Sequence, residues 1–472
     1  MGSAHKLEFG ELTIHPANVT QESSLRLSTK LERIVTRDAS CGSSPSLSRP
    51  GRLALSDATR SRSALSQTNR VPLEMQQGQD IVACHGRHAL LGARVFDGRR
   101  WHNDAAVLIE EGRIRGLAAW GEVPNGWPLR RLPDDALLAP GFIDLQVNGG
   151  GGILLNDEPT VEGMRAIARA HRRYGTTACL PTLITDSRRQ TQAAVAAART
   201  AAGSGGVLGV HLEGPFISPA RPGIHRADHI AVPQVSDLDW LADLAGAGRS
   251  LITLAPERVP DGFVNTLAAA GIRVSAGHSQ ATAEVVMRAI EEGLTGVTHL
   301  FNAMPPLAGR EPGIIGAAFA EHRLTAGIIV DGIHVDPITV RAAFAAKGAD
   351  AIALVSDAMP SVGARLNEFQ LMGRTISLRQ GRLTAQDGTL AGAHLDMASA
   401  VRNAVKLAKL PLDDALRAAS LTPARFLGLE DERGAFICGA HADMVALTSD
   451  LDIIGTWIDG VEHSYVGCYE HL

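Results

Sequence analysis

Aromatic side chains and net charge are both scarce in this chain of 472 residues. Aromatic residues make up 4% of the sequence, against 45% for hydrophobic residues as a whole, so small and aliphatic side chains dominate. Such a composition suits helices packed tightly on a parallel sheet. The net charge of −5, with both signs dispersed, leaves no basic surface for nucleic acid or an anionic membrane.

Long apolar runs and paired cysteines are also missing. No run reaches the roughly 18 apolar residues that a membrane span needs, and the N-terminus lacks the apolar core of a signal peptide. The five cysteines are scattered, and no two of them form a CxxC pair. We therefore expect reduced thiols in a cytoplasmic enzyme, with neither nucleic acid nor membrane as a partner.

Residues 1–85 differ in composition from the rest of the chain. Between Cys41 and Arg70 there are eight Ser, five Arg and one acidic residue, with no sustained periodicity. Such a segment buries too little apolar surface to offset the entropy of ordering, so we expect a disordered extension. Its composition is typical of an organellar transit peptide, and equally of a translated upstream segment with Met75 nearer to the working start.

Both ends of the remaining chain, residues 86–138 and 434–472, have the pattern of β-hairpins. Apolar or alternating runs separated by turn residues occur at 90–96, 105–109, 113–117, 442–447, 453–458 and from 461 onward. We predict one small β-sandwich built from these two parts.

Strands and helices alternate in residues 139–433, which is the pattern of βα units. Helices are expected at 161–174, 187–202, 281–292 and 337–347. Strands are expected at 142–147, 177–180, 207–211, 251–254, 272–276, 296–299, 325–330 and 352–355. Eight strands is the number that closes a (β/α)8 TIM-like barrel, and we predict this α/β fold. A doubly wound open sheet is the alternative, but no GxGxxG follows the first strand.

Three potential metal ligands stand where predicted strands end. Glu213, His278 and His299 each follow an apolar run, and the carboxyl ends of barrel strands meet at one mouth. Two imidazoles and one carboxylate suit Zn²⁺, or a similar ion such as Fe²⁺, with one position left for water. Asp357 follows the eighth strand and could accept and return a proton, unless it simply caps a helix.

Other polar residues follow strands in the same way. They are Asp144, Gln146, Asn148, Glu257 and His334. Any one of them alone would be interpreted as a hydrogen-bonded structural residue. A Glu, two His and an Asp at four separate strand ends are better explained by one catalytic mouth.

Several sequence blocks resemble a known family. The blocks PGFID (140–144), HLEGP (211–215), SAGHS (275–279) and THLFNAM (298–304) are similar to the amidohydrolase superfamily. Within it, they resemble the N-acetylglucosamine-6-phosphate deacetylases, and narrower blocks strengthen that resemblance: GREPG (309–313), DGIH (331–334) and LAG (390–392). The similarity runs from about residue 89 to the C-terminus.

The resemblance implies a role for each matching position. Glu213, His278 and His299 would hold one divalent metal ion per subunit, Zn²⁺ before Fe²⁺, and Asp357 would be the general base and acid. The substrate, an amino sugar phosphate, would contact Ile224, His225, Asn302, Ala303, Arg310, Asp331, His334, Leu390, Ala391 and Gly392. His225 would polarise the acetyl carbonyl. Arg310, which alone would be interpreted as a solvated loop charge, would bind phosphate across the interface of a homodimer.

Two departures from the superfamily pattern matter. Gln146-Val147-Asn148 stands where many members carry His-x-His, and amides are weak ligands for transition metals, so we expect one ion and not two. The segment 393–396 (AHLD) replaces the usual small hydroxyl residues after the LAG block, which leaves the sugar preference open.

Three other functions compete with N-acetylglucosamine 6-phosphate deacetylation. The nearest is the same reaction on N-acetylgalactosamine 6-phosphate. Another is an amidohydrolase acting on cyclic amides, of the dihydroorotase kind, but this requires a bridging Lys after the fourth strand, where the chain has Ala255-Pro256-Glu257. A barrel used only for binding is the third, and the complete ligand set disfavours it.

Overall fold

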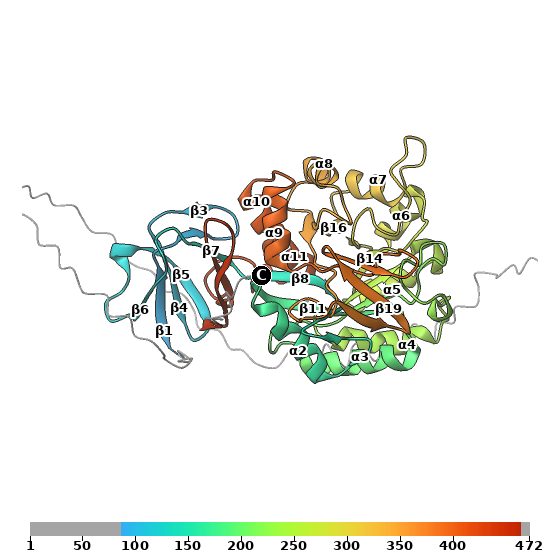
Figure 1. Ribbon diagram of the computed structural model, residues 1–472, viewed down its shortest axis with the longest axis horizontal. Coiled ribbons are helices and arrows are strands. Elements are labelled where there is room, and N and C mark those ends of the chain that lie inside the picture. Colours follow the sequence, from blue (N-terminus) through green and yellow to red (C-terminus); the bar gives the residue numbers. More distant parts are fainter. Residues whose placement is uncertain (1–85, 464–472) are drawn as a thin grey trace, which may run out of the picture. The chain divides into compact units, whose positions relative to one another are not determined.

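The computed structural model describes residues 86–463 (Figure 1). The extension predicted for residues 1–85 lies outside this range. Within the described part, no helix combines the length and the apolar character needed to cross a membrane.

The central sheet has eight parallel strands, and each strand pairs with its neighbours in sequence. The strands are β8 (Phe142–Val147), β11 (Thr176–Ile184), β12 (His211–Glu213), β13 (Leu251–Leu254), β14 (Arg273–Ala276), β15 (Gly296–Val297), β16 (Thr325–Ile328) and β17 (Ile352–Leu354). The first and last strands approach each other where the Asp357 N–H donates to the Gln146 carbonyl at 3.0 Å. Val147 and Ala358 form a parallel bridge there. The sheet is therefore a nearly closed barrel, as predicted.

Helices follow most of the strands and cover the barrel (Figure 1). They are α2 (Val161–Arg172), α3 (Arg188–Ala201), α4 (Asp237–Leu241), α5 (Phe263–Ala269), α6 (Ala283–Glu291), α7 (Gly313–Ala320), α8 (Pro337–Lys347), α9 (Met397–Lys406), α10 (Leu412–Ala419) and α11 (Leu421–Leu427).

Helix α2 shows why these segments are helical. The Thr160 hydroxyl accepts a hydrogen bond from the Gly163 N–H and so caps the first turn. Met164, Ile167 and His171 recur at helical spacing and are buried against the sheet. In the same way, the Asp396 side chain accepts a hydrogen bond from the Ser399 N–H and caps α9.

Strand β12 begins four residues later than the predicted strand at 207–211. Residues 207–210 are buried and are hydrogen-bonded on both sides: the Leu208 N–H donates to the Cys179 carbonyl at 3.0 Å, and the Leu208 carbonyl accepts from the Arg249 N–H at 2.8 Å. The regular register with both neighbouring strands begins at His211, which stands opposite both Thr182 and Leu251. Glu213 is consequently the last residue of the strand, held in the ladder itself.

A three-stranded antiparallel sheet between β17 and α9 was not anticipated. It consists of β18 (Glu368–Leu371), β19 (Arg374–Arg379) and β20 (Arg382–Ala385). Its buried side chains, including Leu371, Ile376 and Leu383, pack with Ile224 and Ala391. The sheet therefore supports two residues that the resemblance assigns to the sugar pocket.

The two ends of the described chain form mixed sheets together, as predicted. One sheet contains β1 (Arg87–Leu91), β4 (Ala105–Glu110), β5 (Arg113–Ala119) and β6 (Leu129–Arg131). The other contains β2 (Arg94–Phe96), β3 (Trp101–His102), β7 (Leu137–Pro140), β21 (Met444–Leu447), β22 (Ile453–Ile458) and β23 (Val461–Glu462). Ile109 and Ile114 of the first sheet share a buried cluster with Leu138, Met444 and Trp457 of the second. The boundaries of these parts at 138/139 and 433/434 stay a prediction.

Candidate metal centre and active site

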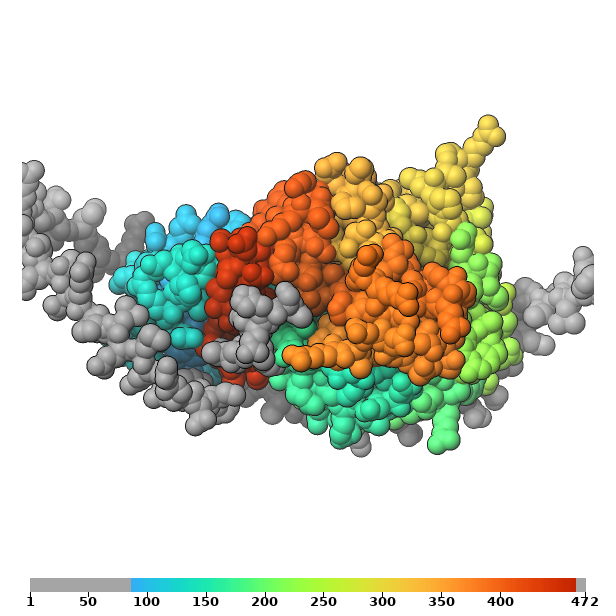
Figure 2. Space-filling model, viewed as in Figure 1, coloured from blue at the N-terminus to red at the C-terminus, as the bar shows by residue number. Residues whose placement is uncertain are grey.

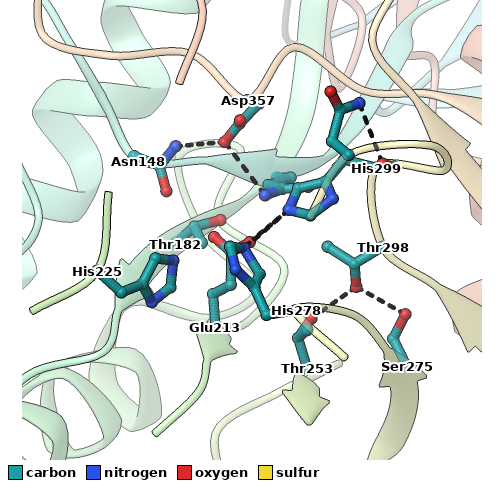
Figure 3. Close-up of polar contacts among 12 residues, drawn as sticks. Asn148, Thr182, Glu213, His225, Thr253, Ser275, His278, Thr298, His299 and Asp357 are labelled. Carbon is teal, nitrogen blue, oxygen red and sulfur yellow. Dashed lines mark hydrogen bonds and ion pairs between the residues drawn. The ribbon is translucent and has the colours of Figure 1, made fainter. Parts of the chain in front are cut away.

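Glu213, His278 and His299 meet in the barrel (Figure 3). Glu213 Oε1 lies 3.1 Å from His278 Nε2 and 2.9 Å from His299 Nε2, and the two Nε2 atoms are 3.1 Å apart. All three residues are at least 95% buried. Three ligand atoms that converge in this way can hold one metal ion.

Backbone strain accompanies the convergence. His278, His299 and Asp357 have positive φ values of 48°, 29° and 49°, a region that non-glycine residues rarely adopt. Each of them follows a barrel strand, so the strained residue turns its side chain at the mouth. Strain of this kind is concentrated at functional sites, where the surrounding structure maintains it.

The charges of the three ligands also fit a cation. Burial alone would raise the pKa of Glu213, but the contacts with His278 and His299 hold it well below its usual range, so the carboxylate is ionised. Burial would lower the pKa of His299, but the hydrogen bond to Glu213 and the charge of that carboxylate raise it above its usual value. A divalent metal would supply the positive charge that this buried carboxylate needs, and Glu with two His is a ligand set that Zn²⁺ accepts. The residues present therefore fit the metal that the sequence predicts.

Asp357 lies beside this cluster and is held by two amides. Asn148 Nδ2 donates to Asp357 Oδ1 at 2.6 Å (Figure 3). Gln146 Nε2 donates to the same oxygen at 3.1 Å. Burial and the negative charge of Glu213 raise the pKa of Asp357 to about 6, although His299 and His334 oppose the shift. A carboxyl group with a pKa close to neutral can both accept and return a proton.

A chain of hydroxyl groups lies inside the barrel next to the ligands. Thr298 Oγ1 donates to Ser275 Oγ at 2.8 Å and lies 2.7 Å from Thr253 Oγ1, which is 2.7 Å from His211 Nε2. Burial lowers the pKa of His211 to about 4, so this ring is neutral. These hydrogen bonds link the neighbouring strands that carry Glu213, His278 and His299, and so hold the three strands in place relative to one another.

The His225 ring lies against His278, one of the three candidate metal ligands, in a tilted arrangement. Its ring centroid is 4.4 Å from that of His278, and the residue is 5% exposed. Burial, with the neighbouring His278, lowers the pKa of His225 to about 3, so the ring carries no charge near neutral pH. Its sequence neighbour Ile224 is buried in the cluster beneath the three-stranded sheet.

Two further predicted groups lie close to Asp357. Asp331 Oδ2 accepts a hydrogen bond from His334 Nδ1 at 2.6 Å, and His334 is near enough to lower the pKa of Asp357. The block 390–392 continues into Ala393, whose N–H donates to the Asp357 carbonyl at 2.9 Å. A Cβ at Gly392 would lie 2.9 Å from that carbonyl oxygen, so the close approach requires glycine.

The three residues predicted to bind the phosphate end do not contact Asp357 or the side chains of the candidate metal ligands. They are Asn302, Ala303 and Arg310. Asn302 Nδ2 donates to the His299 carbonyl at 3.2 Å, and the Ala303 carbonyl accepts from the Ser279 N–H at 3.2 Å, so both shape the turn after His299. Arg310 is exposed in the loop before α7, and the structure does not bring it to the metal ligands.

Gln146, Asn148 and Glu257 are predicted from the sequence to lie at the mouth, but the sequence does not indicate what they do there. Gln146 and Asn148 hold Asp357. Their alternation at the end of β8 was a usable signal, because residues two apart in a strand point to the same side. Glu257 accepts from Ser279 Oγ at 2.6 Å and from the Gln280 N–H at 2.7 Å. It secures the loop after His278, which no sequence signal indicated.

Comparisons with known proteins agree with this site. The family model described as "Amidohydrolase family" matches residues 137–462. The N-acetylgalactosamine-6-phosphate deacetylase of Shewanella sp. (strain ANA-3) is 42% identical over 78% of this chain and 94% of its own length. The N-acetylglucosamine-6-phosphate deacetylase of Haemophilus influenzae is 35% identical over 79% of this chain and 98% of its own length.

Solved structures match as well. The N-acetylglucosamine-6-phosphate deacetylase of Pasteurella multocida has a TM-score of 0.77 at 33% identity, covering 80% of this chain and all of its own. A variant of the N-acetyl-D-glucosamine-6-phosphate deacetylase of Mycobacterium smegmatis was solved in complex with N-acetyl-D-glucosamine-6-phosphate. It has a TM-score of 0.74 at 30% identity and covers 80% of this chain and 99% of its own. The chain therefore belongs to the amidohydrolase family. Within that family it groups with the amino sugar 6-phosphate deacetylases.

Proposed function

We propose that this chain hydrolyses the N-acetyl group of N-acetylglucosamine 6-phosphate and so releases glucosamine 6-phosphate and acetate. The observation that carries the proposal is the buried set Glu213, His278 and His299 with Asp357 beside it. The similarity to deacetylases over their full lengths supports the substrate class.

One divalent ion per subunit, Zn²⁺ before Fe²⁺, is the cofactor of this proposal, held by Glu213, His278 and His299. When bound, it would lower the pKa of a water molecule toward about 7 and polarise the acetyl carbonyl. A second ion is not expected, because the amides of Gln146 and Asn148 already donate to Asp357.

Asp357 moves the proton in this mechanism. Both amides hold its Oδ1, so Oδ2 is the oxygen left to accept a proton from the attacking water. The same oxygen then delivers that proton to the amide nitrogen as the bond to the acetyl carbon breaks. His225 lies next to His278 and would donate a hydrogen bond to the acetyl oxygen as negative charge develops on it.

The sugar phosphate would be bound by the remaining predicted residues. Asp331 and His334 form a hydrogen-bonded pair near Asp357 that suits the sugar ring, and Ile224 with residues 390–392 would line the pocket. Arg310, which is exposed, would bind phosphate in the neighbouring site of a homodimer. Asn302 and Ala303 would contact the phosphate end.

The two cysteines in the described range, Cys179 and Cys438, are free, which supports a cytoplasmic setting.

N-acetylgalactosamine 6-phosphate is the second candidate substrate. The specific observation in its favour is the 42% identity with the Shewanella enzyme. The two sugars differ in the configuration of one hydroxyl group, so acetate release from each should be measured side by side on protein of known metal content. A preference of tenfold or more in kcat/KM, about 1.4 kcal/mol, would assign the substrate. Absence of acetate release from both by metal-loaded protein would contradict the proposal.

Asp357→Asn tests the proton-transfer role. We expect turnover to fall by about 10²–10⁴-fold, because an amide cannot accept the proton, while the metal content stays near that of the parent protein. Turnover and metal per chain are the two measurements. Normal turnover in this variant would remove Asp357 from the mechanism.

A further inference from the structure

Asn148, the residue after β8, has a buried amide oxygen to which no group of the described chain donates. Its amide nitrogen donates to Asp357 Oδ1 at 2.6 Å. Its Oδ1 atom has no hydrogen-bond partner within residues 86–463, and the residue is 2% exposed. Buried polar side-chain atoms are nearly always hydrogen-bonded, because an unpaired one gives up its contacts with water for nothing. A free acceptor beside the proton-transfer group therefore points to a ligand that donates to it.

The two ends of the Asn148 amide cannot be exchanged. The pKa of Asp357 is about 6, so above this pH its carboxylate only accepts hydrogen bonds. The NH2 group of Asn148 must therefore face Asp357, and Oδ1 must face elsewhere. In Figure 3 this oxygen points away from Asp357, on the side of the site where His225 lies.

The backbone holds Asn148 in this position. Its carbonyl accepts from the Leu155 N–H at 3.0 Å, and the N–H of the next residue, Gly149, donates to the Ala358 carbonyl at 2.9 Å. Ala358 directly follows Asp357, so these bonds fix Asn148 and Asp357 relative to each other. A rotation that turned the Asn148 oxygen to another place would break the contact with Asp357.

The reaction proposed above brings an N–H group to this place. Asp357 returns its proton to the nitrogen of the acetamido group, so this nitrogen must come within hydrogen-bond reach of Asp357 Oδ2. The Asn148 amide already contacts the other oxygen of the same carboxylate. The N–H of the acetamido group is consequently the donor of the sugar phosphate that the reaction carries to Asn148.

We propose that Asn148 Oδ1 accepts a hydrogen bond from the N–H of the acetamido group, and so favours amide substrates over the matching acetate esters. An ester has an oxygen in place of the N–H, which would set two acceptors against each other. Asn148 thus orients Asp357 with one end of its amide and binds the group being cleaved with the other. This inference rests on the proposed function, but not on which amino sugar is preferred, because both sugars carry the same acetamido group.

Acetate release from an amide and from its ester tests the contact in the zinc-loaded protein. The two substrates are N-acetylglucosamine 6-phosphate and 2-O-acetylglucose 6-phosphate. Asn148→Leu keeps the branched shape of the side chain but cannot accept a hydrogen bond. We expect its kcat/KM to fall at least about tenfold more for the amide than for the ester. An equal fall for both substrates would overturn the proposal, because Asn148 would then act only through Asp357 or on the attacking water.

Gln146→Met is the matched control. Gln146 is as buried as Asn148 and donates to the same oxygen of Asp357 at 3.1 Å. Its loss weakens the hold on Asp357 and leaves the Asn148 oxygen in place, so kcat/KM should fall by the same factor, within about twofold, for the amide and the ester. A fall confined to the amide in this variant as well would assign the effect to Asp357 and contradict the proposal.

A crystal structure of the unmodified, zinc-loaded protein decides the question if Asn148→Leu loses its metal or its fold. The ligand is the sugar phosphate with a methanesulfonamide in place of the acetamide, which keeps the N–H and resists hydrolysis. We expect its nitrogen within about 3.2 Å of Asn148 Oδ1. A nitrogen bonded to another acceptor overturns the proposal. Acetate release by the unmodified protein tests the proposed function separately, so the two failures are distinguishable.

Discussion

Within residues 86–463, two clusters of His and acidic residues have a spacing that suits a metal ion. One is Glu213 with His278 and His299 in the barrel, and the other is His441 with Asp443 and Asp459 in the sheets formed by the chain ends. In each cluster the ligand atoms lie within 4.8 Å of one another. Distance alone therefore does not separate them.

Charge and burial do separate the two clusters. Arg433 pairs with Asp443, and His441 pairs with Asp459, whose side chain is 55% exposed. In the barrel cluster, the ion partners of Glu213 within the described chain are the two histidines, and all three residues are buried. The first cluster needs a cation, whereas Arg433 already supplies one to the second. Converging ligands thus indicate a metal site only when no side chain balances their charge.

Glu213→Gln should have the largest effect, because it removes the negative charge from the barrel cluster. A neutral amide is a poor ligand, so we expect metal content to fall well below one ion per chain and turnover to fall more than about 10³-fold. Metal analysis after dialysis and acetate release are the measurements. A variant that keeps a full equivalent of metal would show that the carboxylate is dispensable.

Arg433→Met breaks the charge balance of the other cluster. Asp443 is 5% exposed and would keep a buried charge without its partner, so we expect a loss of about 3–5 kcal/mol in the free energy of unfolding. Added Zn²⁺ should raise the melting temperature of this variant and not that of the parent protein. Arg433→Lys, which keeps the charge, is the control. A loss below about 1 kcal/mol would mean that Arg433 is not what balances Asp443.

Asp144 sharpens the comparison, because it is a buried carboxyl group that pairs with no cationic side chain in the described part of the protein. Burial raises the pKa of Asp144 to about 7, against hydrogen bonds from Ser356 and the Gln146 N–H. The folded state therefore holds its proton more tightly than the unfolded state. The resulting loss of stability is absent below the unfolded pKa near 3.8, grows as the pH rises toward 7, and is complete above it.

Asp144→Asn should remove this pH dependence. We expect the variant to be more stable than the parent protein above pH 7, with the advantage vanishing toward pH 4. Urea unfolding of both proteins between pH 4 and 8 measures it, with the exposed Asp261→Asn as control. A variant less stable than the parent at pH 8 would mean that burial does not raise the pKa of Asp144 in the folded protein.

His441→Ala should have the smallest effect. Its partner Asp459 is largely exposed, so we expect a change below about 1 kcal/mol in the free energy of unfolding. Metal content and turnover should equal those of the parent protein. Loss of a metal ion from this variant would show that the second cluster does bind one.

Much of the barrel could be predicted from the sequence, because apolar runs and the residues that end them are local signals. Glu213, His278 and His299 were identified in this way, since each stands at a strand end and barrel strands end at a common mouth. The three-stranded sheet at 368–385 was missed, although its alternating apolar residues, such as Phe369 and Leu371, were a readable signal.

The sequence by itself determined which residue types the chain offers at the mouth, because strand periodicity and strand ends depend on neighbours within a few residues. Only the tertiary structure decided that Gln146 and Asn148 orient Asp357, more than 200 positions away. It also decided that Arg433 balances Asp443. Contacts of this kind depend on how distant segments pack and on which charges burial leaves unbalanced, and neither quantity is carried by a local pattern.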